Sequence, residues 1–575
     1  MIPIIKKSIL LLFSTVVVFS TNSQNVHWVN TFGKSGNDRA NKIACDANGN
    51  VYMAGTFTGS NVAFGSFTLS SNNNSNDIFA AKMDAKGDCL WAVRIGGSVN
   101  EPDECALEID AFDNLFITGG IVNTATFGST DGNNNSKTST GKTDFFIARY
   151  SSDGVLDWVQ TATGLGDDNA NDLCTDKDGN VYAVGHYGHN GNTAKFGSTT
   201  LKAASSYDMF ITKLDSSGNF VWSKSEGGNG DDWGSGVTCD DFGNVYFSAE
   251  YGYGGTQTTL AGQSVPTKGG WDGSLIKYRA SDGSPVWVRT FNSNGGEVLT
   301  IVKTDKYGNI FGFGYYQTNT IFKSGNASLN PPNSDPSSVM LMKYDSNGII
   351  HWISYGATSS LAGAYDMSFN KEKDSIIVCG FTPDDMQFNG SNNYVISAPL
   401  SFYYAMFDTA GNFGRAKTFG SSNGSVNYAV GVCYDKFDNI FVSGFFQNSI
   451  DFGGTTKSSN GQSIDGFLMK YGDKTGGNEG QIGFDKYQGS FSNLSLYPNP
   501  SNVSTLLTFR INSSSSLKIQ ISSIEGKTVW ETNAHKILAG DHSTTLSTEQ
   551  LSEGIYIVRL ITEGTSTNSK LVVKR

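Results

Sequence analysis

Acidic residues recur in this chain at places where several carboxylates could meet. They stand just before short runs of small residues, as Asn37-Asp38, Asp103-Glu104, Asp167-Asp168, Asp231-Asp232 and Glu297. Calcium prefers several hard oxygen ligands, so a ring of such carboxylates could hold it. The candidate metal ligands are therefore Asp38, Asp103, Asp167, Asp168, Asp231 and Asp232. The alternative is a repeated turn with solvated acids, which needs no ion.

A second acidic pattern, Asp-x-x-Gly-Asn, also suggests calcium at first sight. Asp46-Ala-Asn-Gly-Asn50 is one copy. The pattern lacks the alternating oxygen ligands and the distant bidentate Glu of an EF-hand loop. A hairpin needs a residue at positive φ, which Gly or Asn supplies, and an Asp side chain can cap the turn. The pattern therefore predicts hairpin turns.

Three segments resemble catalytic or ligand-binding motifs but lack the required context. Gly420-Ser-Ser-Asn-Gly424 matches G-x-S-x-G, yet no helix follows it. Gly141-Lys-Thr143 resembles half a phosphate loop, with Ser136 where the first glycine belongs. His186-Tyr-Gly-His189 could bind a metal, but no third ligand is identifiable. We predict no catalytic residue and a protein that is not an enzyme.

Aromatic residues in the variable loops offer a different chemistry. They are Tyr187, Tyr251, Tyr253 and Trp271. Exposed rings could stack on sugars, whereas buried rings would be ordinary packing residues. Sequence alone leaves both alternatives open.

All of these residues belong to a unit that is repeated seven times. Each unit has an acidic or amide residue, a short turn and a strand ending in a small residue, as in Asp46–Gly55. The unit begins at positions 46, 110, 176, 240, 305, 370 and 435, which we number as repeats 1 to 7. A period that regular indicates one supersecondary unit that must stack on its neighbours to bury a core.

Each repeat contains four strand-like segments. The fourth is marked by a tryptophan in five repeats, at Trp91, Trp158, Trp222, Trp287 and Trp352, whereas repeat 6 has Arg415. Four strands in each of seven units predict an all-β fold, a seven-bladed β-propeller. Repeat 7 has no tryptophan strand after Tyr471, and a lone tryptophan strand stands at 26–32. We therefore expect the N-terminal strand to complete the seventh blade and close the ring.

The two ends of the chain differ from the repeats. Residues 1–24 carry Lys6, Lys7 and a short apolar run, which predict a secretory signal peptide. The propeller is expected over 25–474, a Gly- and Asn-rich linker over 475–492, and a small Ig-like β-sandwich over 493–575. No other long apolar segment exists, so we expect no transmembrane segment in the mature chain.

Charge and cysteine content limit the function classes. The net charge of −12 argues against nucleic acid, which needs clustered Lys and Arg. Four of the seven cysteines lie at or next to one repeat position, namely Cys45, Cys174, Cys239 and Cys433. They are interpreted as small core residues rather than a disulfide framework. Cys89 and Cys105 form the only pair that is close in sequence, and no C-x-x-C motif supports zinc or a redox pair.

The C-terminal segment resembles the type A sorting domain of the type IX secretion system of Bacteroidetes. The matching motifs are Tyr497-Pro-Asn-Pro500, Gly526-Lys-Thr-Val529, Leu551–Arg559 and Lys570–Arg575. The resemblance implies export across the outer membrane and release or attachment at the cell surface, with the secretion machinery as a partner. It also implies a sorting signal at Pro498, Asn499, Pro500, Gly554, Tyr556, Lys574 and Arg575.

The repeats resemble the SBBP family of β-propeller repeats. Gly227-Gly-Asn-Gly-Asp-Asp232 and Asp240–Tyr246 carry that resemblance. The family has no assigned chemistry, so the resemblance leaves function open. We expect a binding or adhesion module for a glycan or protein partner. The alternatives are an extracellular polysaccharide hydrolase or lyase with carboxylates at the channel mouth, and a structural surface-layer protein.

Overall fold

The computed structural model describes residues 25–34, 36–268, 270–291, 295–317, 322–324, 327–329, 338–358, 362–388, 400–420, 425–461, 463–472, 491–511, 515–523, 527–533, 535–537, 540–562 and 566–575. The predicted signal peptide and nearly all of the predicted linker lie outside them. The chain divides into two compact units, 1–405 with 409–480, and 406–408 with 481–575. The described residues form β-strands and one short 3₁₀ turn, Asn72–Asn74.

Repeats 1 to 6 each fold into an antiparallel meander of four strands, and repeat 7 contributes three. In repeat 3 the order is β13 (Asn169–Thr175), β14 (Val181–Tyr187), β17 (Asp208–Leu214) and β18 (Phe220–Gly228). The equivalent strands are β2 (Arg39–Cys45), β3 (Val51–Thr58), β6 (Asn76–Met83) and β7 (Cys89–Gly96) in repeat 1, and β8 (Cys105–Ile109), β9 (Leu115–Phe127), β10 (Asn135–Tyr150) and β11 (Leu156–Thr161) in repeat 2. They are β19 (Asp231–Cys239), β20 (Asn244–Tyr253), β23 (Asp272–Arg279) and β24 (Pro285–Phe291) in repeat 4, and β25 (Glu297–Thr304), β26 (Ile310–Tyr316), β29 (Ser338–Tyr344) and β30 (Ile350–Thr358) in repeat 5. They are β31 (Gly363–Phe369), β32 (Ser375–Thr382), β34 (Ser401–Asp408) and β35 (Phe413–Phe419) in repeat 6, and β36 (Asn427–Tyr434), β37 (Ile440–Gln447) and β40 (Ile464–Gly472) in repeat 7.

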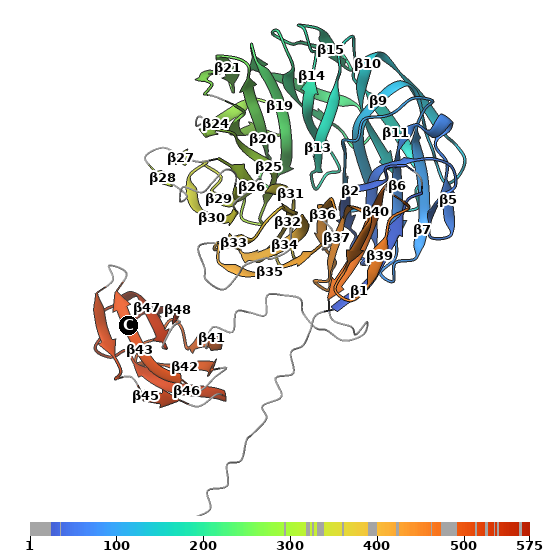
Figure 1. The fold of residues 1–575 in the computed structure, drawn as a ribbon. Coiled ribbons are helices and arrows are strands. Elements are labelled where there is room, and N and C mark those ends of the chain that lie inside the picture. The colour runs from blue at the N-terminus through green and yellow to red at the C-terminus, as the bar shows by residue number, and fades with distance from the viewer. Residues whose placement is uncertain are drawn as a thin grey trace, which may run out of the picture. The chain divides into compact units, whose positions relative to one another are not determined.

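The first strands of the repeats lie next to one another at the centre. β2 contacts β8, and the series continues through β13, β19, β25, β31 and β36, which contacts β2. Figure 1 shows the sheets standing around this centre in the order of the sequence. The fold of this unit is therefore a β-propeller.

The two ends of the repeat region meet in one sheet. β1 (Asn25–Phe32) pairs antiparallel with β40, outside the β36–β37–β40 meander. A disulfide joins Cys45 of β2 to Cys433 of β36, with the two Cα atoms 6.1 Å apart. The interpretation of these two cysteines as plain core residues was wrong. Their separation of 388 residues hides the pair from any local reading of the sequence.

Short strands extend the loops between the second and third strands. They are β4 (Val62–Phe64) with β5 (Phe67–Leu69), β15 (Thr193–Phe196) with β16 (Thr199–Lys202), β21 (Gln257–Leu260) with β22 (Gln263–Pro266), β27 (Phe322–Ser324) with β28 (Ala327–Leu329), and β38 (Ser449–Asp451) with β39 (Thr456–Ser458). The remaining short strands, β12 (Thr163–Gly164) and β33 (Met386–Phe388), pair with β15 and β30.

The tryptophan strands hold neighbouring repeats together. The Trp91 indole N–H donates to the Ser152 carbonyl of the next repeat over 3.0 Å. Trp28, Trp158, Trp222 and Trp287 make the equivalent bond to Ala85, Ser216, Ala280 and Ser346. Each ring therefore contributes both buried area and a satisfied donor at a repeat boundary.

The Asp-x-x-Gly-Asn pattern forms the predicted hairpin turns. Asp46 Oδ1 accepts hydrogen bonds from the backbone N–H groups of Asn48 and Asn50, both at 2.8 Å. The same bonds are made by Asp110, Asp176, Asp240, Asp305 and Asp435. The aspartate thus organises its own turn.

The C-terminal unit contains two antiparallel sheets. One is β41 (Phe491–Tyr497), β42 (Ser504–Ile511) and β46 (Gly540–Ser547); the other is β44 (Thr528–Glu531), β43 (Ser515–Ser523), β47 (Gly554–Ile561) and β48 (Ser566–Val573), with β45 (His535–Ile537) paired to β43. Leu507 and Phe509 of the first sheet share a core with Ile519, Val558 and Leu571 of the second. Its first strand begins two residues before the predicted boundary. Among the described residues, no helix has the length and apolar character needed to span a membrane.

Candidate functional site

One edge of the propeller sheets is formed by corresponding strand ends of successive repeats. The start of a first strand lies beside the end of the second, as Asn169 pairs with His186. The start of the third strand joins them, as Asp208 pairs with Tyr187. We call the surface that these strand ends form the loop face. All the candidate carboxylates lie on it.

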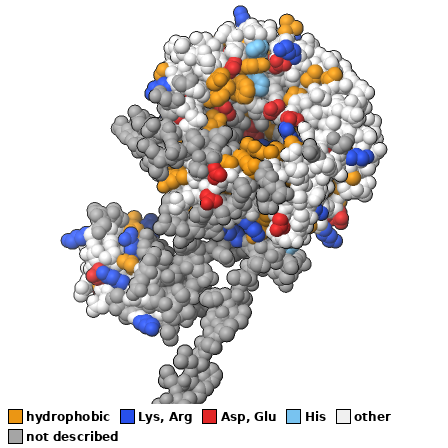
Figure 2. Space-filling model, viewed as in Figure 1, with side chains coloured by type: hydrophobic (Ala, Val, Ile, Leu, Met, Phe, Trp, Pro, Cys, Tyr) orange, Lys and Arg blue, Asp and Glu red, His pale blue; other side chains and the backbone are white. Residues whose placement is uncertain are grey.

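Six aromatic side chains form a continuous row on the loop face of repeats 3 and 4. In order they are His189, Tyr207, His186, Trp233, Trp271 and Tyr253, and their ring centroids lie 4.5, 5.2, 5.1, 5.1 and 5.0 Å apart. We call this set the aromatic row. Figure 2 shows hydrophobic and histidine side chains gathered on this face of the propeller.

The aromatic row combines apolar ring faces with unused polar atoms. Nδ1 of His186, Nδ1 of His189 and Nε1 of Trp233 have no hydrogen-bond partner within the described part of the chain. Burial lowers the pKa of His186 to about 4, although Asp167 and Asp231 oppose the shift. The imidazole of His186 is therefore neutral at neutral pH. The row therefore offers ring faces for stacking, while its three unpartnered nitrogens are themselves buried.

Two of the predicted carboxylates flank the aromatic row. Asp167 Oδ2 accepts from the Tyr207 hydroxyl at 3.2 Å and from Lys142 Nζ at 3.3 Å. Asp231 accepts from the Ser206 hydroxyl. Both carboxylates are partly exposed, Asp167 with 27% of its side chain accessible. They are placed to accept hydrogen bonds from the hydroxyl groups of a ligand lying on the rings.

The buried carboxylates have a different role from the predicted one. Asp38, Asp168 and Asp232 are fully buried. They accept from the backbone N–H groups of Thr58, Gly188 and Gly252, each twenty residues further along the chain. Burial raises the pKa of Asp38 to about 6 and that of Asp168 and Asp232 to about 7. These three side chains hold the loops in place.

Asp103 lies apart from the other candidates, in a polar pocket of about 900 Å³. It forms an ion pair with Arg39 at 2.5 Å and accepts from Asn76 Nδ2 at 2.8 Å. Asn37, Asn74, Asn100, Asn460 and Ser463 also line this pocket. Among the described residues, no three His, Cys, Asp or Glu side chains gather as a metal site would require. Calcium binding stays a prediction.

The four loop aromatics of the sequence analysis fall into two classes. Tyr187 and Tyr251 are fully buried. They are packing residues, the second of the two alternatives, because alternate side chains of β14 and β20 point into the sheet interface. Tyr253, which is 53% exposed, and Trp271 belong to the aromatic row. Tyr207 and Trp233 were not predicted from the sequence, although Tyr207 precedes the third-strand Asp208 and Trp233 follows the acidic candidate Asp232.

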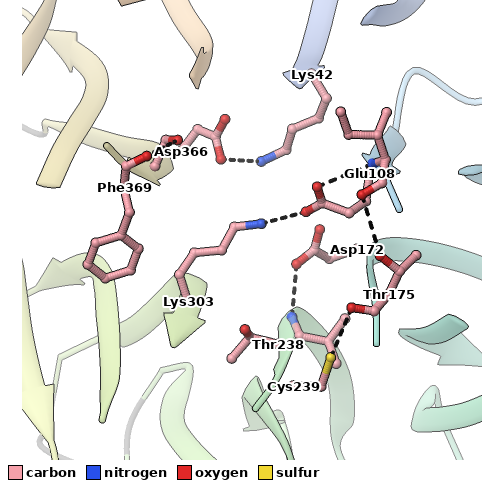
Figure 3. A network of polar contacts seen from close by, with 12 residues as sticks. Lys42, Glu108, Asp172, Thr175, Thr238, Cys239, Lys303, Asp366 and Phe369 are labelled. Carbon is pink, nitrogen blue, oxygen red and sulfur yellow. Dashed lines mark hydrogen bonds and ion pairs between the residues drawn. The ribbon is translucent and has the colours of Figure 1, made fainter. Parts of the chain in front are cut away.

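A network of ion pairs crosses the centre of the propeller (Figure 3). Lys42 Nζ lies 3.0 Å from Asp366, and Lys303 Nζ lies 2.9 Å from Glu108. Burial alone would lower the pKa of Lys303, but Glu108, Asp172 and Asp366 outweigh it and raise that pKa. The sequence carried a signal for this network. Lys42, Asp172 and Asp366 all stand four residues before the turn residue of their repeat.

The sorting motifs of the C-terminal unit come together around the last strand. Asn499 donates to the Lys570 carbonyl at 2.7 Å and accepts from Val572 N–H at 2.8 Å. The Arg575 guanidinium donates to the carbonyls of Thr548, Glu549 and Leu551. The other motif residues lie close by: Pro498 and Pro500 flank Asn499, Gly554 opens β47, the Tyr556 hydroxyl donates to Ser552, and Lys574 N–H donates to Ser501.

Comparison with known proteins identifies the C-terminal unit. The family described as "Secretion system C-terminal sorting domain" matches residues 495–574. This domain directs type IX secretion. The protein is therefore exported and is either displayed at the cell surface or secreted. The resemblance of the repeats to the SBBP family stays a prediction.

The repeats have distant similarity to other propellers. An uncharacterised WD repeat-containing protein of Acanthamoeba polyphaga mimivirus is 23% identical over 288 residues, which cover 44% of this chain and 20% of that protein. The virginiamycin B lyase of Staphylococcus aureus is 8% identical with a TM-score of 0.34, covering 77% of this chain and 98% of that one. PorZ, a surface component of the type IX secretion system of Porphyromonas gingivalis, is 10% identical with a TM-score of 0.23, covering 95% and 100%.

Proposed function

We propose that this protein is an exported binding and adhesion module that recognises a surface glycan through the aromatic row. The observation that carries the proposal is the unbroken series of six rings from His189 to Tyr253, flanked by Asp167 and Asp231. A sugar presents apolar C–H faces and hydroxyl edges. The rings match the faces, and the carboxylates match the hydroxyls.

One feature favours binding over catalysis. Asp168 and Asp232, two of the acids whose pKa burial raises to about 7, are fully buried and accept hydrogen bonds from backbone amides. They cannot reach a substrate on the loop face, so they are unsuited to act as general acid and base. The proposed module therefore holds its ligand without turning it over.

The same proposal includes the closed ring. We infer seven blades, with β1 as the fourth strand of the seventh. The pairing of β1 with β40 and the contacts that run from β2 around to β36 support this. Closure of the propeller leaves no exposed sheet edge between the first and last repeats. It also holds repeats 3 and 4, which carry the aromatic row, in fixed positions.

The proposal is tested by a glycan array probed with the full exported chain, with calcium and again with a chelator. For any glycan that binds, Trp233→Ala is expected to weaken affinity about tenfold, because losing one stacked indole removes ~1.4 kcal/mol. Tyr253→Ala tests the exposed end of the row without touching the core. Phe242→Ala is the control, since Phe242 is 67% exposed and lies in the turn at the opposite edge of the sheets.

The outcomes separate the alternatives. Glycan binding that requires calcium would support the predicted calcium site formed by the carboxylates. Equal affinity of the wild-type, Trp233→Ala and Tyr253→Ala proteins would place the ligand elsewhere. Shortening of a bound polysaccharide, abolished by Asp167→Asn or Asp231→Asn, would establish the hydrolase or lyase instead.

A further inference from the structure

Two cysteines of repeats 3 and 4 occupy the same repeat positions as the Cys45–Cys433 disulfide. Cys433 stands two residues before the turn residue of repeat 7, and Cys45 stands one residue before that of repeat 1. Cys174 stands two residues before the turn residue of repeat 3, and Cys239 stands one before that of repeat 4. Each pair therefore has one cysteine in a repeat and the other in the next repeat around the centre.

The strand register confirms that these positions are equivalent. Cys433 pairs across to Phe441 and Cys174 to Tyr182. Cys45 pairs to Val51 and Cys239 to Val245. The first strands that carry them are direct neighbours in both cases, β36 with β2 and β13 with β19. Cys174 and Cys239 therefore occupy the same backbone positions on neighbouring first strands as Cys433 and Cys45, which are bonded.

The surroundings of the two thiols agree with this placement. Cys239 Sγ lies 3.1 Å from the Thr175 carbonyl, next in sequence to Cys174 (Figure 3). Burial, followed by the neighbouring Cys239 thiol, raises the pKa of the Cys174 thiol. Both residues stand as thiols in this structure. Among the other described thiols, Cys105 and Cys379 occupy different repeat positions from these four.

We propose that Cys174 and Cys239 form a second inter-repeat disulfide in the exported protein. The two thiols lose two protons and two electrons as the S–S bond forms. The electrons pass by thiol–disulfide exchange to a protein disulfide donor, which is reduced to its dithiol. Export across the outer membrane takes the chain through an oxidising compartment, where such donors act.

The bond joins the two repeats that build the aromatic row. His186, His189 and Tyr207 come from repeat 3, and Trp233, Trp271 and Tyr253 come from repeat 4. A covalent link between β13 and β19 fixes the spacing of the two halves of the row. The bond itself does not depend on what the row binds.

Peptide mapping of the full exported chain tests the proposal directly. The unreduced protein is denatured, alkylated and digested with trypsin, which places Cys174 in peptide 150–177 and Cys239 in peptide 225–268. We expect these two peptides joined, with a mass two hydrogen atoms below their sum. Alkylation of both cysteines, in a sample where Cys45 and Cys433 are joined, would overturn the proposal.

A reductant series gives a second measurement. In the Cys45→Ala/Cys433→Ala variant we expect reductant to lower the midpoint of denaturant unfolding. Adding Cys174→Ala to that variant should abolish the effect of reductant on the midpoint. Cys105→Ala in the same background is the matched control, because it truncates a buried thiol that the proposal leaves unbonded. If reductant does not change the unfolding midpoint of the Cys45→Ala/Cys433→Ala variant, Cys174 and Cys239 are not bonded. If the background variant does not fold, the peptide map of the wild-type chain decides alone.

Discussion

At the scale of single residues, adjacent acids in the same motif have different roles. Asp168 is enclosed and accepts from Gly188 N–H, whereas Asp167, one residue earlier, reaches Tyr207 on the surface. Adjacent residues of a strand start point to opposite sides, so one acid faces the interior and the other the solvent. The Asp167-Asp168 pair, which the sequence suggests as a metal site, therefore consists of one surface carboxylate and one buried hydrogen-bond acceptor.

The buried acids make a prediction about pH. Burial raises the folded-state pKa of four aspartates from 3.8 to about 7, namely Asp168, Asp208, Asp232 and Asp272. The folded state therefore binds these protons more tightly than the unfolded chain, and stability rises as pH falls through 7. We expect a gain of at most about 1 kcal/mol per group between pH 8 and pH 6.5, measured by denaturant unfolding.

The comparison across variants isolates one group. Asp168→Asn is expected to reduce the pH slope, and Asp178→Asn, an exposed turn residue, to leave it unchanged. His186 has the opposite effect, because its folded-state pKa is lowered from 6.5 to about 4. It lowers the stability of the fold as the pH falls, but only at pH values below about 6.5. A propeller that loses stability between pH 8 and pH 6.5 would contradict this account.

At the scale of elements, a tryptophan strand packs on the turn of the next repeat at every boundary except the one after repeat 6, which has Arg415. Gly154 adopts φ +79°, and a Cβ placed there would lie 2.8 Å from Cδ2 of Trp91. Gly218 and Gly283 stand in the same relation to Trp158 and Trp222. The glycine of the turn therefore provides both the positive φ and the room for the ring.

This arrangement predicts the effect of adding one methyl group. Gly154→Ala should destabilise the propeller by about 1–3 kcal/mol more than Gly132→Ala, because both strain a positive φ but only the first displaces an indole. Gly132 has φ +81°, and nothing lies within 4 Å of a Cβ placed there. Denaturant unfolding of the two variants measures the difference. Equal losses would mean that the ring does not press on the turn.

At the scale of the whole molecule, one chain combines a β-propeller with an export domain. The propeller carries the aromatic row, and the C-terminal unit carries the sorting motifs around Asn499 and Arg575. The Arg575 guanidinium organises the 548–551 segment through three carbonyls. Nη1 of the same guanidinium donates to the Asn502 carbonyl, so two nitrogens fixed in one plane contact two segments, whereas a lysine has a single nitrogen.

The export step can be tested at that residue. Both Arg575→Ala and Arg575→Lys should reduce the amount of protein that reaches the medium or cell surface in a type IX secretion host, with the protein held in the periplasm. Lys536→Ala, an exposed basic residue on β45, is the control and should be exported normally. Normal export of Arg575→Ala would show that this contact is dispensable for sorting.

The sequence by itself determined the features that depend on local chemistry. The period near 65 residues, the Asp46-type turns, the tryptophan strands and the sorting motifs could all be predicted, because turn residues and alternating strands leave their pattern within a few positions. Only the tertiary structure decided which residues meet across repeats. The Cys45–Cys433 bond, the ion pairs of Lys42 and Lys303, and the aromatic row each join strands that become neighbours only when the sheets assemble around the centre. Burial in that assembly also separated Asp168 from Asp167 and Tyr251 from Tyr253, which the sequence presents as alike.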